Sequence, residues 1–199
     1  MIIGVDFDNT IVCYDKLFYN VALKKGLVPR NLTPVKEEIR NYLRRKNKEH
    51  LWTELQGYVY GPCIFNARPF RGVKNFFIHC KKLKIRVYII SHKTIHPFLG
   101  LKHDLHKYAN QWLEKQGFYS PRIGLPKKSV FFELTKEEKL KRIKKQKCTH
   151  FIDDLPEFLL EEKFPSKVAR ILFDPNGKYK YNKNFQTFNS WTEAIKKIK

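Results

Sequence analysis

The chain has 199 residues, of which 42% are hydrophobic and 15% aromatic, and it carries 40 Lys and Arg against 19 Asp and Glu. This apolar content excludes a disordered polycation, the lack of any long apolar stretch excludes a membrane-spanning segment, and the length suits one domain or one domain with an insertion. The net charge of +21 favours anionic partners, among them nucleic acid, phosphorylated metabolites and acidic membrane surfaces.

The first predicted element is a buried strand over residues 2–7, which is apolar until it reaches acidic residues. Residues 13–67 then interrupt the pattern, because they look helical throughout. We interpret 13–67 as a small helical cap inserted after the first strand and folding over the carboxyl edge of a sheet. Residues 1–12 and 68–199 are expected to form the core domain.

Two helices are predicted inside this insertion. The first covers residues 14–25 and the second residues 34–46. Thr33 is the expected N-cap of the second helix, and Pro34 its first helical residue, a position that proline favours.

Beyond the insertion, short apolar strands alternate with helices that begin at capping boxes or end near glycine. This alternation predicts an α/β fold, with a Rossmann-like, mainly parallel sheet and helices on both faces. Ligands bind such sheets at the carboxyl ends of the strands. In chain order we expect a helix at 73–82, a strand at 86–90, a helix at 104–116, a strand at 129–133, a helix at 135–147, strands at 150–152 and 168–173, and a helix from 190.

Two carboxylates stand at the end of the first strand, in Asp6-Phe7-Asp8-Asn9-Thr10. On an extended chain they would point to opposite faces, but beyond the strand end the backbone can turn and bring both into one pocket. Buried carboxylates are costly unless they are paired or bind a metal. We therefore expect Asp6 and Asp8 to be functional.

A second acidic pair, Asp153-Asp154, follows the apolar strand near residue 150. Taken alone, the pair fits the N-cap of a helix at Pro156 as well as it fits a metal site. Together with Asp6 and Asp8 it predicts a metal site, because clustered carboxylates need a cation and hard oxygen ligands suit Mg²⁺.

These motifs, in this order, resemble those of the haloacid dehalogenase-like (HAD) superfamily of aspartate-nucleophile hydrolases. The first matches Asp6-Phe7-Asp8-Asn9-Thr10 and the second, a strand ending in Ser, matches Val87-Tyr88-Ile89-Ile90-Ser91. The third is a lysine near a helix start, and the fourth matches Phe151-Ile152-Asp153-Asp154. The segment Arg68-Pro69-Phe70-Arg71-Gly72-Val73 also resembles the return from a cap into the core, so the resemblance spans nearly the whole chain.

The resemblance implies a phosphoryl transfer reaction with two acidic catalytic residues. Asp6 would attack phosphorus and form an aspartyl-phosphate, while Asp8 would protonate the leaving group and then deprotonate the attacking water. In the family, a carboxylate at position 8 favours hydrolysis of phosphate esters over dehalogenation or phosphonate cleavage, and phosphoryl-transferring mutases share the same acidic pair. The resemblance also implies that Mg²⁺ is held by the Asp6 carboxylate, the Asp8 main-chain carbonyl and Asp153, with Asp154 in the inner shell or reaching through water.

The phosphate-binding residues implied are Ser91, through its hydroxyl, and His92, through its backbone N–H. For the lysine of the third motif, we favour Lys139 over Lys136, which competes as an ordinary residue of the first helical turn. The side chains of His92 and Lys93 are expected at the pocket mouth, although His92 fits equally well as a loop histidine that caps a nearby helix.

The leading hypothesis is a Mg²⁺-dependent phosphatase for a small phosphorylated metabolite, a nucleotide or a sugar phosphate. Most aromatic residues of 13–67 are assigned to packing, although one or two near Arg40, Arg44 and Arg45 could hold a nucleotide base. One alternative is a nucleic-acid end phosphatase docked by the basic surface, since the charge allows nucleic acid as a partner without requiring it. The other is a non-enzymatic phosphate-binding protein. Neither a membrane nor an obligate protein partner is indicated.

The N-terminus lacks the features of a secretory signal, so we expect folding to begin at residue 1 and a cytoplasmic location. The four cysteines contain no CxxC pair and are expected to be reduced thiols. They are Cys13, Cys63, Cys80 and Cys148.

Overall fold

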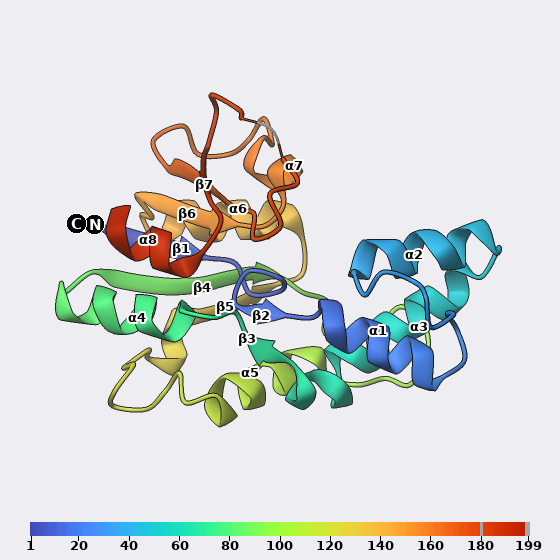
Figure 1. Cartoon of the computed structure of the whole chain (residues 1–199). Coiled ribbons are helices and arrows are strands. Elements are labelled where there is room, and N and C mark those ends of the chain that lie inside the picture. The colour runs from blue at the N-terminus through green and yellow to red at the C-terminus, as the bar shows by residue number, and fades with distance from the viewer. Residues whose placement is uncertain (180, 198–199) are drawn as a thin grey trace. The chain divides into compact units, whose positions relative to one another are not determined.

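The computed structural model describes residues 1–179 and 181–197 and divides into two compact units (Figure 1). The core unit comprises Met1–Val12, Pro69–Lys93 and the chain from Glu114 onward. The inserted unit comprises Cys13–Arg68 and Thr94–Leu113. The second of these segments was placed in the core domain by the sequence analysis, whereas the structure groups it with the inserted helices.

A six-stranded parallel sheet lies at the centre of the core unit. The predicted α/β, Rossmann-like fold is therefore confirmed, although the last strand was not predicted. In the order β5-β4-β1-β6-β7-β8, the strands are Val130–Glu133, Arg86–His92, Ile2–Val5, His150–Asp153, Ala169–Phe173 and Gln186–Phe188.

Apolar clusters cover both faces of this sheet. Ile143 and Leu172 belong to a buried cluster on one face. Phe173, the next residue along β7, points the other way because side chains alternate along a strand. Its ring lies 5.3 Å from that of Trp191, which lies 4.7 Å from that of Phe76. The helices of the core unit are α4 Val73–Lys82, α6 Lys136–Lys145, α7 Pro156–Leu159 and α8 Trp191–Lys197.

Both predicted capping boxes mark helix starts. The Thr135 hydroxyl accepts a hydrogen bond from the Glu138 backbone N–H, and the Glu138 carboxylate accepts one from the Thr135 N–H, so α6 begins at the next residue. At α8 the Ser190 hydroxyl accepts from the Glu193 N–H. These bonds satisfy N–H groups that have no partner inside the first turn.

The helices of the inserted unit pack around aromatic rings. Phe18 lies 5.1 Å from Trp52 and 5.5 Å from Tyr60, and Tyr60 lies 5.0 Å from Tyr14, measured between ring centroids. The structure therefore confirms that these aromatic residues serve packing. The unit contains α1 Asp15–Lys24, α2 Lys36–Arg45, α3 Glu49–Tyr60, the 3₁₀ helix η1 Pro62–Asn66 and most of α5 Leu105–Lys115.

The start of α2 corrects one sequence prediction. The helix begins at Lys36 with Val35 at the N-cap position, and not at Pro34 with Thr33 as the cap. The backbone N–H of Lys36 donates instead to Oδ1 of Asp15, at 3.1 Å. A carboxylate from α1 thus supplies the acceptor that a local residue usually provides.

Two contacts explain why α5 joins the inserted helices. The indole N–H of Trp112 donates to the Ala67 carbonyl at 3.0 Å, and the ring of Tyr108 lies 5.8 Å from that of Phe65. Because both residues of α5 contact the segment before Arg68, its first part belongs to the same compact unit. A role for this unit as a cap over the active site stays a prediction.

The chain first passes between the units through β2 Val12–Cys13 and β3 Arg68–Pro69, which form a separate two-stranded sheet. It passes between them again after Lys93 and after Leu113. No helix within the described residues has the length and apolar character needed to cross a membrane. The four cysteines, all within the described residues, are free thiols.

Candidate active site

Three adjacent strands of the core unit bring the predicted site residues to one edge of the sheet. β1 lies between β4 and β6, and all three run in the same direction. Asp6 follows β1 directly, Ser91 lies near the carboxyl end of β4, and Asp153 is the last residue of β6. This is the edge at which parallel α/β sheets bind ligands.

Asp6 is buried and is held from two sides. Its Oδ1 accepts a hydrogen bond from the Ser91 hydroxyl at 2.9 Å and one from the Lys139 ammonium at 2.6 Å. Burial raises the pKa of Asp6 from 3.8 to about 7; the Lys139 charge opposes this shift and the Asp153 charge adds to it. The raised pKa of Asp6 therefore reflects mainly its removal from water, which disfavours the charged carboxylate.

Lys139 connects two of the acidic residues. Its side chain is 3% exposed, and its ammonium lies 2.6 Å from Oδ1 of Asp6 and 2.6 Å from Oδ2 of Asp153. Burial alone would lower the pKa of Lys139, but the carboxylates of Asp153 and Asp6 raise it above its ordinary value. Lys136 lies elsewhere: it is about half exposed and its ammonium is 3.8 Å from Glu161. Of the two candidate lysines, only Lys139 lies among the acidic residues.

Asp153 accepts a local hydrogen bond, whereas Asp154 accepts one from the turn after β1. Oδ1 of Asp153 accepts from the Leu155 backbone N–H at 3.0 Å, and Oδ1 of Asp154 accepts from the Thr10 hydroxyl at 3.2 Å. Carboxylate oxygens from Asp6, Asp153 and Asp154 all lie within 4.8 Å of one another. The three clustered carboxylates offer oxygen ligands of the kind that suits a hard divalent cation such as Mg²⁺.

A tight turn positions Asp8 and Thr10 after β1. Asn9 adopts a left-handed conformation with φ of 56°, which asparagine tolerates better than most residues, and the N–H groups of Ile11 and Val12 donate to the Phe7 carbonyl. The backbone therefore reverses directly after Asp8, as the sequence analysis expected.

Lys93 is a site residue whose role sequence analysis missed. Its ammonium lies 2.7 Å from Oδ2 of Asp8, and its side chain is 3% exposed, although it was expected at the pocket mouth. Its backbone N–H donates to the Glu133 carbonyl at 2.8 Å, which continues the pairing of β4 with β5. Ser91 and Lys93 are two residues apart on an extended chain, so both side chains point to one face. That spacing was the signal available in the sequence.

The side chain of His92 does not join the acidic residues. It is exposed, and its Nε2 lies 3.0 Å from the Leu134 carbonyl, just before α6. This position beside a helix start is closer to the loop-histidine interpretation than to a substrate contact. The phosphate-binding role of the His92 backbone N–H stays a prediction.

No family model matches the chain, and no curated protein matches it. Solved structures do share its fold. A HAD-superfamily hydrolase of subfamily IA from Geobacter sulfurreducens has a TM-score of 0.59 and 11% sequence identity, covering 98% of this chain and 94% of its own. A predicted phosphoglycolate phosphatase from Haemophilus somnus has a TM-score of 0.58 and 16% identity, covering 98% and 96%.

A third similar structure is a protein described as a HAD-hydrolase, YfnB of Bacillus subtilis, bound to magnesium. Its TM-score is 0.51 and its identity 12%, with 98% of this chain and 96% of its own covered. At these identities the likeness establishes the fold alone. The chain shares the fold of these HAD-superfamily structures, and its four motifs resemble those of the same superfamily.

Proposed function

We propose that this protein is a Mg²⁺-dependent phosphoric monoester hydrolase that acts on a small phosphorylated metabolite, a nucleotide or a sugar phosphate, through an aspartyl-phosphate intermediate. The observation that carries the proposal is the arrangement around Asp6. One of its carboxylate oxygens is held by a hydroxyl and an ammonium, and two further carboxylates lie within metal-binding distance. A nucleophile, a cation for the phosphoryl oxygens and a metal donor set are what phosphoryl transfer requires.

We assign the nucleophilic attack to Oδ2 of Asp6. Both of the hydrogen bonds that the described residues make to this carboxylate fall on Oδ1, so Oδ1 is the anchored oxygen. The anchored oxygen fixes the plane of the carboxylate and keeps the other oxygen oriented toward the incoming phosphorus. Orientation of this kind lowers the entropic cost of reaching the transition state.

Lys139 and Ser91 are suited to receive the phosphoryl oxygens, because each already donates to a negatively charged oxygen at the strand ends. The lysine supplies a full charge and the serine a neutral donor. Donors that are in place before the reaction stabilise charge that develops in the transition state without a cost of reorganisation.

Asp8 is assigned the proton transfers. It would donate a proton to the leaving oxygen and then take one from the water that attacks the aspartyl-phosphate. The ion pair with Lys93 holds the Asp8 carboxylate in one orientation. Because Asp8 is 20% exposed while Lys93 is almost fully buried, the acidic side chain is the member that can reach a substrate.

The carboxylates of Asp6, Asp153 and Asp154 fit a Mg²⁺ ion, together with the main-chain carbonyl of Asp8. When bound, the ion would offset the charge of these carboxylates and allow an anionic nucleophile to approach an anionic substrate. Thr10 supports this donor set, because its hydroxyl holds Asp154 in place.

The test is hydrolysis of p-nitrophenyl phosphate by the wild type and by Asp6→Asn, with Mg²⁺ and with chelator. Asp6→Asn keeps the size of the side chain but removes the nucleophile, so activity should fall to background. Asp104→Asn, a similar change at an exposed carboxylate that accepts from the Lys107 N–H, is the control and should keep full activity. Activity retained by Asp6→Asn would refute the assignment of the nucleophile.

A further inference from the structure

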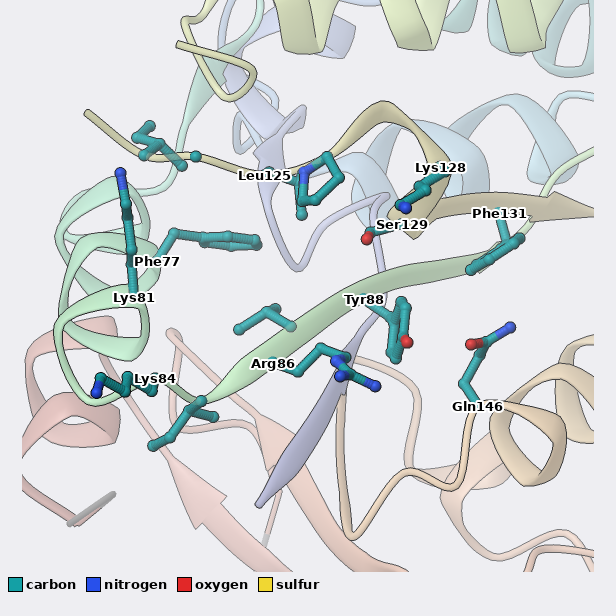
Figure 2. Close-up of a pocket in the computed structure, with 15 residues that line it drawn as sticks. Phe77, Lys81, Lys84, Arg86, Tyr88, Leu125, Lys128, Ser129, Phe131 and Gln146 are labelled. Carbon is teal, nitrogen blue, oxygen red and sulfur yellow. The ribbon is translucent and has the colours of Figure 1, made fainter. Parts of the chain in front are cut away.

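A cavity of about 670 Å³ opens in the core unit, at the amino ends of β4 and β5 (Figure 2). Arg86, the first residue of β4, contributes to its wall. Ser91, which contacts Asp6, lies five residues further along the strand, a distance of about 17 Å on an extended chain. The cavity therefore lies at the opposite edge of the sheet from the acidic residues and is separate from the proposed catalytic site.

The cavity exists because β5 is shorter than β4. Pairing between the two strands begins at Ile89 and Val130, so the segment 86–88 of β4 has no partner in β5. A 3₁₀ turn, η2 Lys127–Ser129, precedes β5 instead. The space that a longer strand would fill is lined by side chains from α4, β4, this turn and the end of α6.

The wall of the cavity is strongly basic. Four exposed cations line it, and no acidic residue does; the cations are Lys81, Lys84, Arg86 and Lys128. Within residues 1–179 and 181–197, none of these four side chains makes an ion pair. Lys81 donates to the Pro121 carbonyl and so links α4 to the segment that follows α5. Uncompensated cations around a concave surface concentrate anions.

The same cavity presents half-buried aromatic rings. The rings of Tyr88 and Phe131 lie 6.0 Å apart. The guanidinium of Arg142 lies 4.3 Å from the centroid of the Phe131 ring and occupies one of its faces, which leaves Tyr88 as the better stacking surface. Figure 2 shows Tyr88, Phe131 and Gln146 on one side of the cavity and Lys81 and Lys84 on the other. The figure also shows Arg86 beside Tyr88 and Lys128 near Phe131, so cations and rings lie close together within one cavity.

A second cavity of the core unit provides a comparison. It has a volume of about 680 Å³ and is also lined by lysines, among them Lys163 and Lys167, but no aromatic ring lines it and Glu137 does. Basic side chains alone are therefore common on this protein. The combination of unpaired cations with exposed ring surface distinguishes the cavity at Arg86.

We propose that the cavity at the amino ends of β4 and β5 binds a nucleoside phosphate. The base stacks on Tyr88 and its polar edge meets the Gln146 amide, which can both donate and accept. The phosphates lie toward Arg86, Lys84 and Lys81. The volume falls within the range of about 300 to 1,000 Å³ that is usual for small-molecule sites. The proposal concerns a site apart from Asp6 and does not depend on the proposed hydrolysis.

The test measures calorimetric binding of three probes in the presence of chelator: ATP, adenosine, and inorganic triphosphate. ATP should bind the wild type more tightly than either of the other probes, because only ATP engages both sides of the cavity. Tyr88→Ala should weaken the binding of ATP about 5- to 150-fold, the loss expected for one stacked base, and should leave the affinity for triphosphate unchanged. Arg86→Glu combined with Lys84→Glu should weaken the binding of both ATP and triphosphate roughly 10-fold or more.

A matched control makes the result specific. Lys163→Glu combined with Lys167→Glu makes the same change of charge at the other basic cavity and should bind ATP as the wild type does. If Tyr88→Ala fails to fold, Tyr88→Leu removes the ring while keeping much of the volume. Equal affinity for ATP and triphosphate, or equal loss in the Lys163 and Lys167 control, would overturn the proposal. So would an oligonucleotide that binds far more tightly than ATP and is unaffected by Tyr88→Ala.

Discussion

Lys93 and Asp8 form an ion pair that is almost closed to solvent on the lysine side, with Nζ of Lys93 2.7 Å from Oδ2 of Asp8. The lysine directly follows β4 and the aspartate lies in the turn after β1, and these two strands pair in parallel. Lys93 also lies 5.7 Å from the centroid of the Phe7 ring. The pair therefore fixes the side chain to which we assign proton transfer.

Replacing Lys93 should lower the rate of hydrolysis by an amount that depends on the leaving group of the substrate. Lys93→Met leaves Asp8 without the cation that orients it, so kcat for an alkyl phosphate should fall roughly 10- to 100-fold. An aryl phosphate has a better leaving group and depends less on protonation by an acid, so kcat for this substrate should fall less. Steady-state kinetics on glycerol phosphate and p-nitrophenyl phosphate measure both.

Lys136→Met is the matched control, since Lys136 is a partly exposed lysine whose ammonium lies 3.8 Å from Glu161. It should leave both rates unchanged. Equal losses on the two substrates in Lys93→Met would contradict a role of Lys93 in proton transfer and indicate a general structural effect.

Lys139 should be needed for stability when no metal is bound. Lys139→Met leaves the buried carboxylates of Asp6 and Asp153 without their shared ammonium. Removal of one member of such a buried pair costs about 3–5 kcal/mol in the free energy of unfolding. Urea denaturation in chelator measures this loss, and Lys136→Met should change it by less than about 0.5 kcal/mol. An equally small effect of both substitutions would show that Lys139 does not compensate the carboxylates.

The metal-free protein should lose stability as the pH rises. The folded state holds a proton on Asp6 up to a pKa of about 7, against 3.8 for the ordinary side chain, mainly because the carboxyl group is buried. Between these values the folded state binds more protons than the unfolded chain, so the free energy of unfolding falls with increasing pH. Asp6→Asn removes this contribution.

Thermal unfolding in chelator at pH values on either side of this interval provides the measurement. The unfolding temperature of the wild type should decline with pH more steeply than that of Asp6→Asn, and added Mg²⁺ should stabilise the wild type more at the higher pH. Parallel pH profiles for the two proteins would show that Asp6 keeps an ordinary pKa.

The sequence predicted the parts of the fold that local pattern determines. Strands β1 and β6 are continuous apolar runs, and the capping box of Thr135 and Glu138 specifies the start of α6 without help from the rest of the chain. The acidic residues could be assigned to one site because parallel strands end at the same edge. Ser91 could be assigned for the same reason.

Features that depend on tertiary contacts were missed. β8 contains only Gln186–Phe188, and it is a strand because its backbone pairs with β7. The cap of α2 comes from Asp15, 21 residues before Lys36. Neither relationship leaves a local signal, since each is created by elements that meet only in the folded state.

Lys93 and the cavity at Arg86 were missed for a different reason. In a chain with 40 Lys and Arg, one lysine after a strand does not stand out. The cavity follows from the register between β4 and β5, which starts at Ile89 and Val130 and cannot be read from either strand alone.

The central claim is that Asp6 becomes phosphorylated during turnover. In the most direct measurement, the protein turns over p-nitrophenyl phosphate and the reaction is quenched during turnover. The protein is then reduced with borohydride, and its peptides are sequenced by mass spectrometry. An acyl phosphate at Asp6 is reduced to homoserine, so the account predicts this conversion at Asp6 in the wild type and at no site in Asp6→Asn. Turnover of the substrate with reduction at another aspartate, or with an intact Asp6 under conditions that accumulate the intermediate, would contradict it.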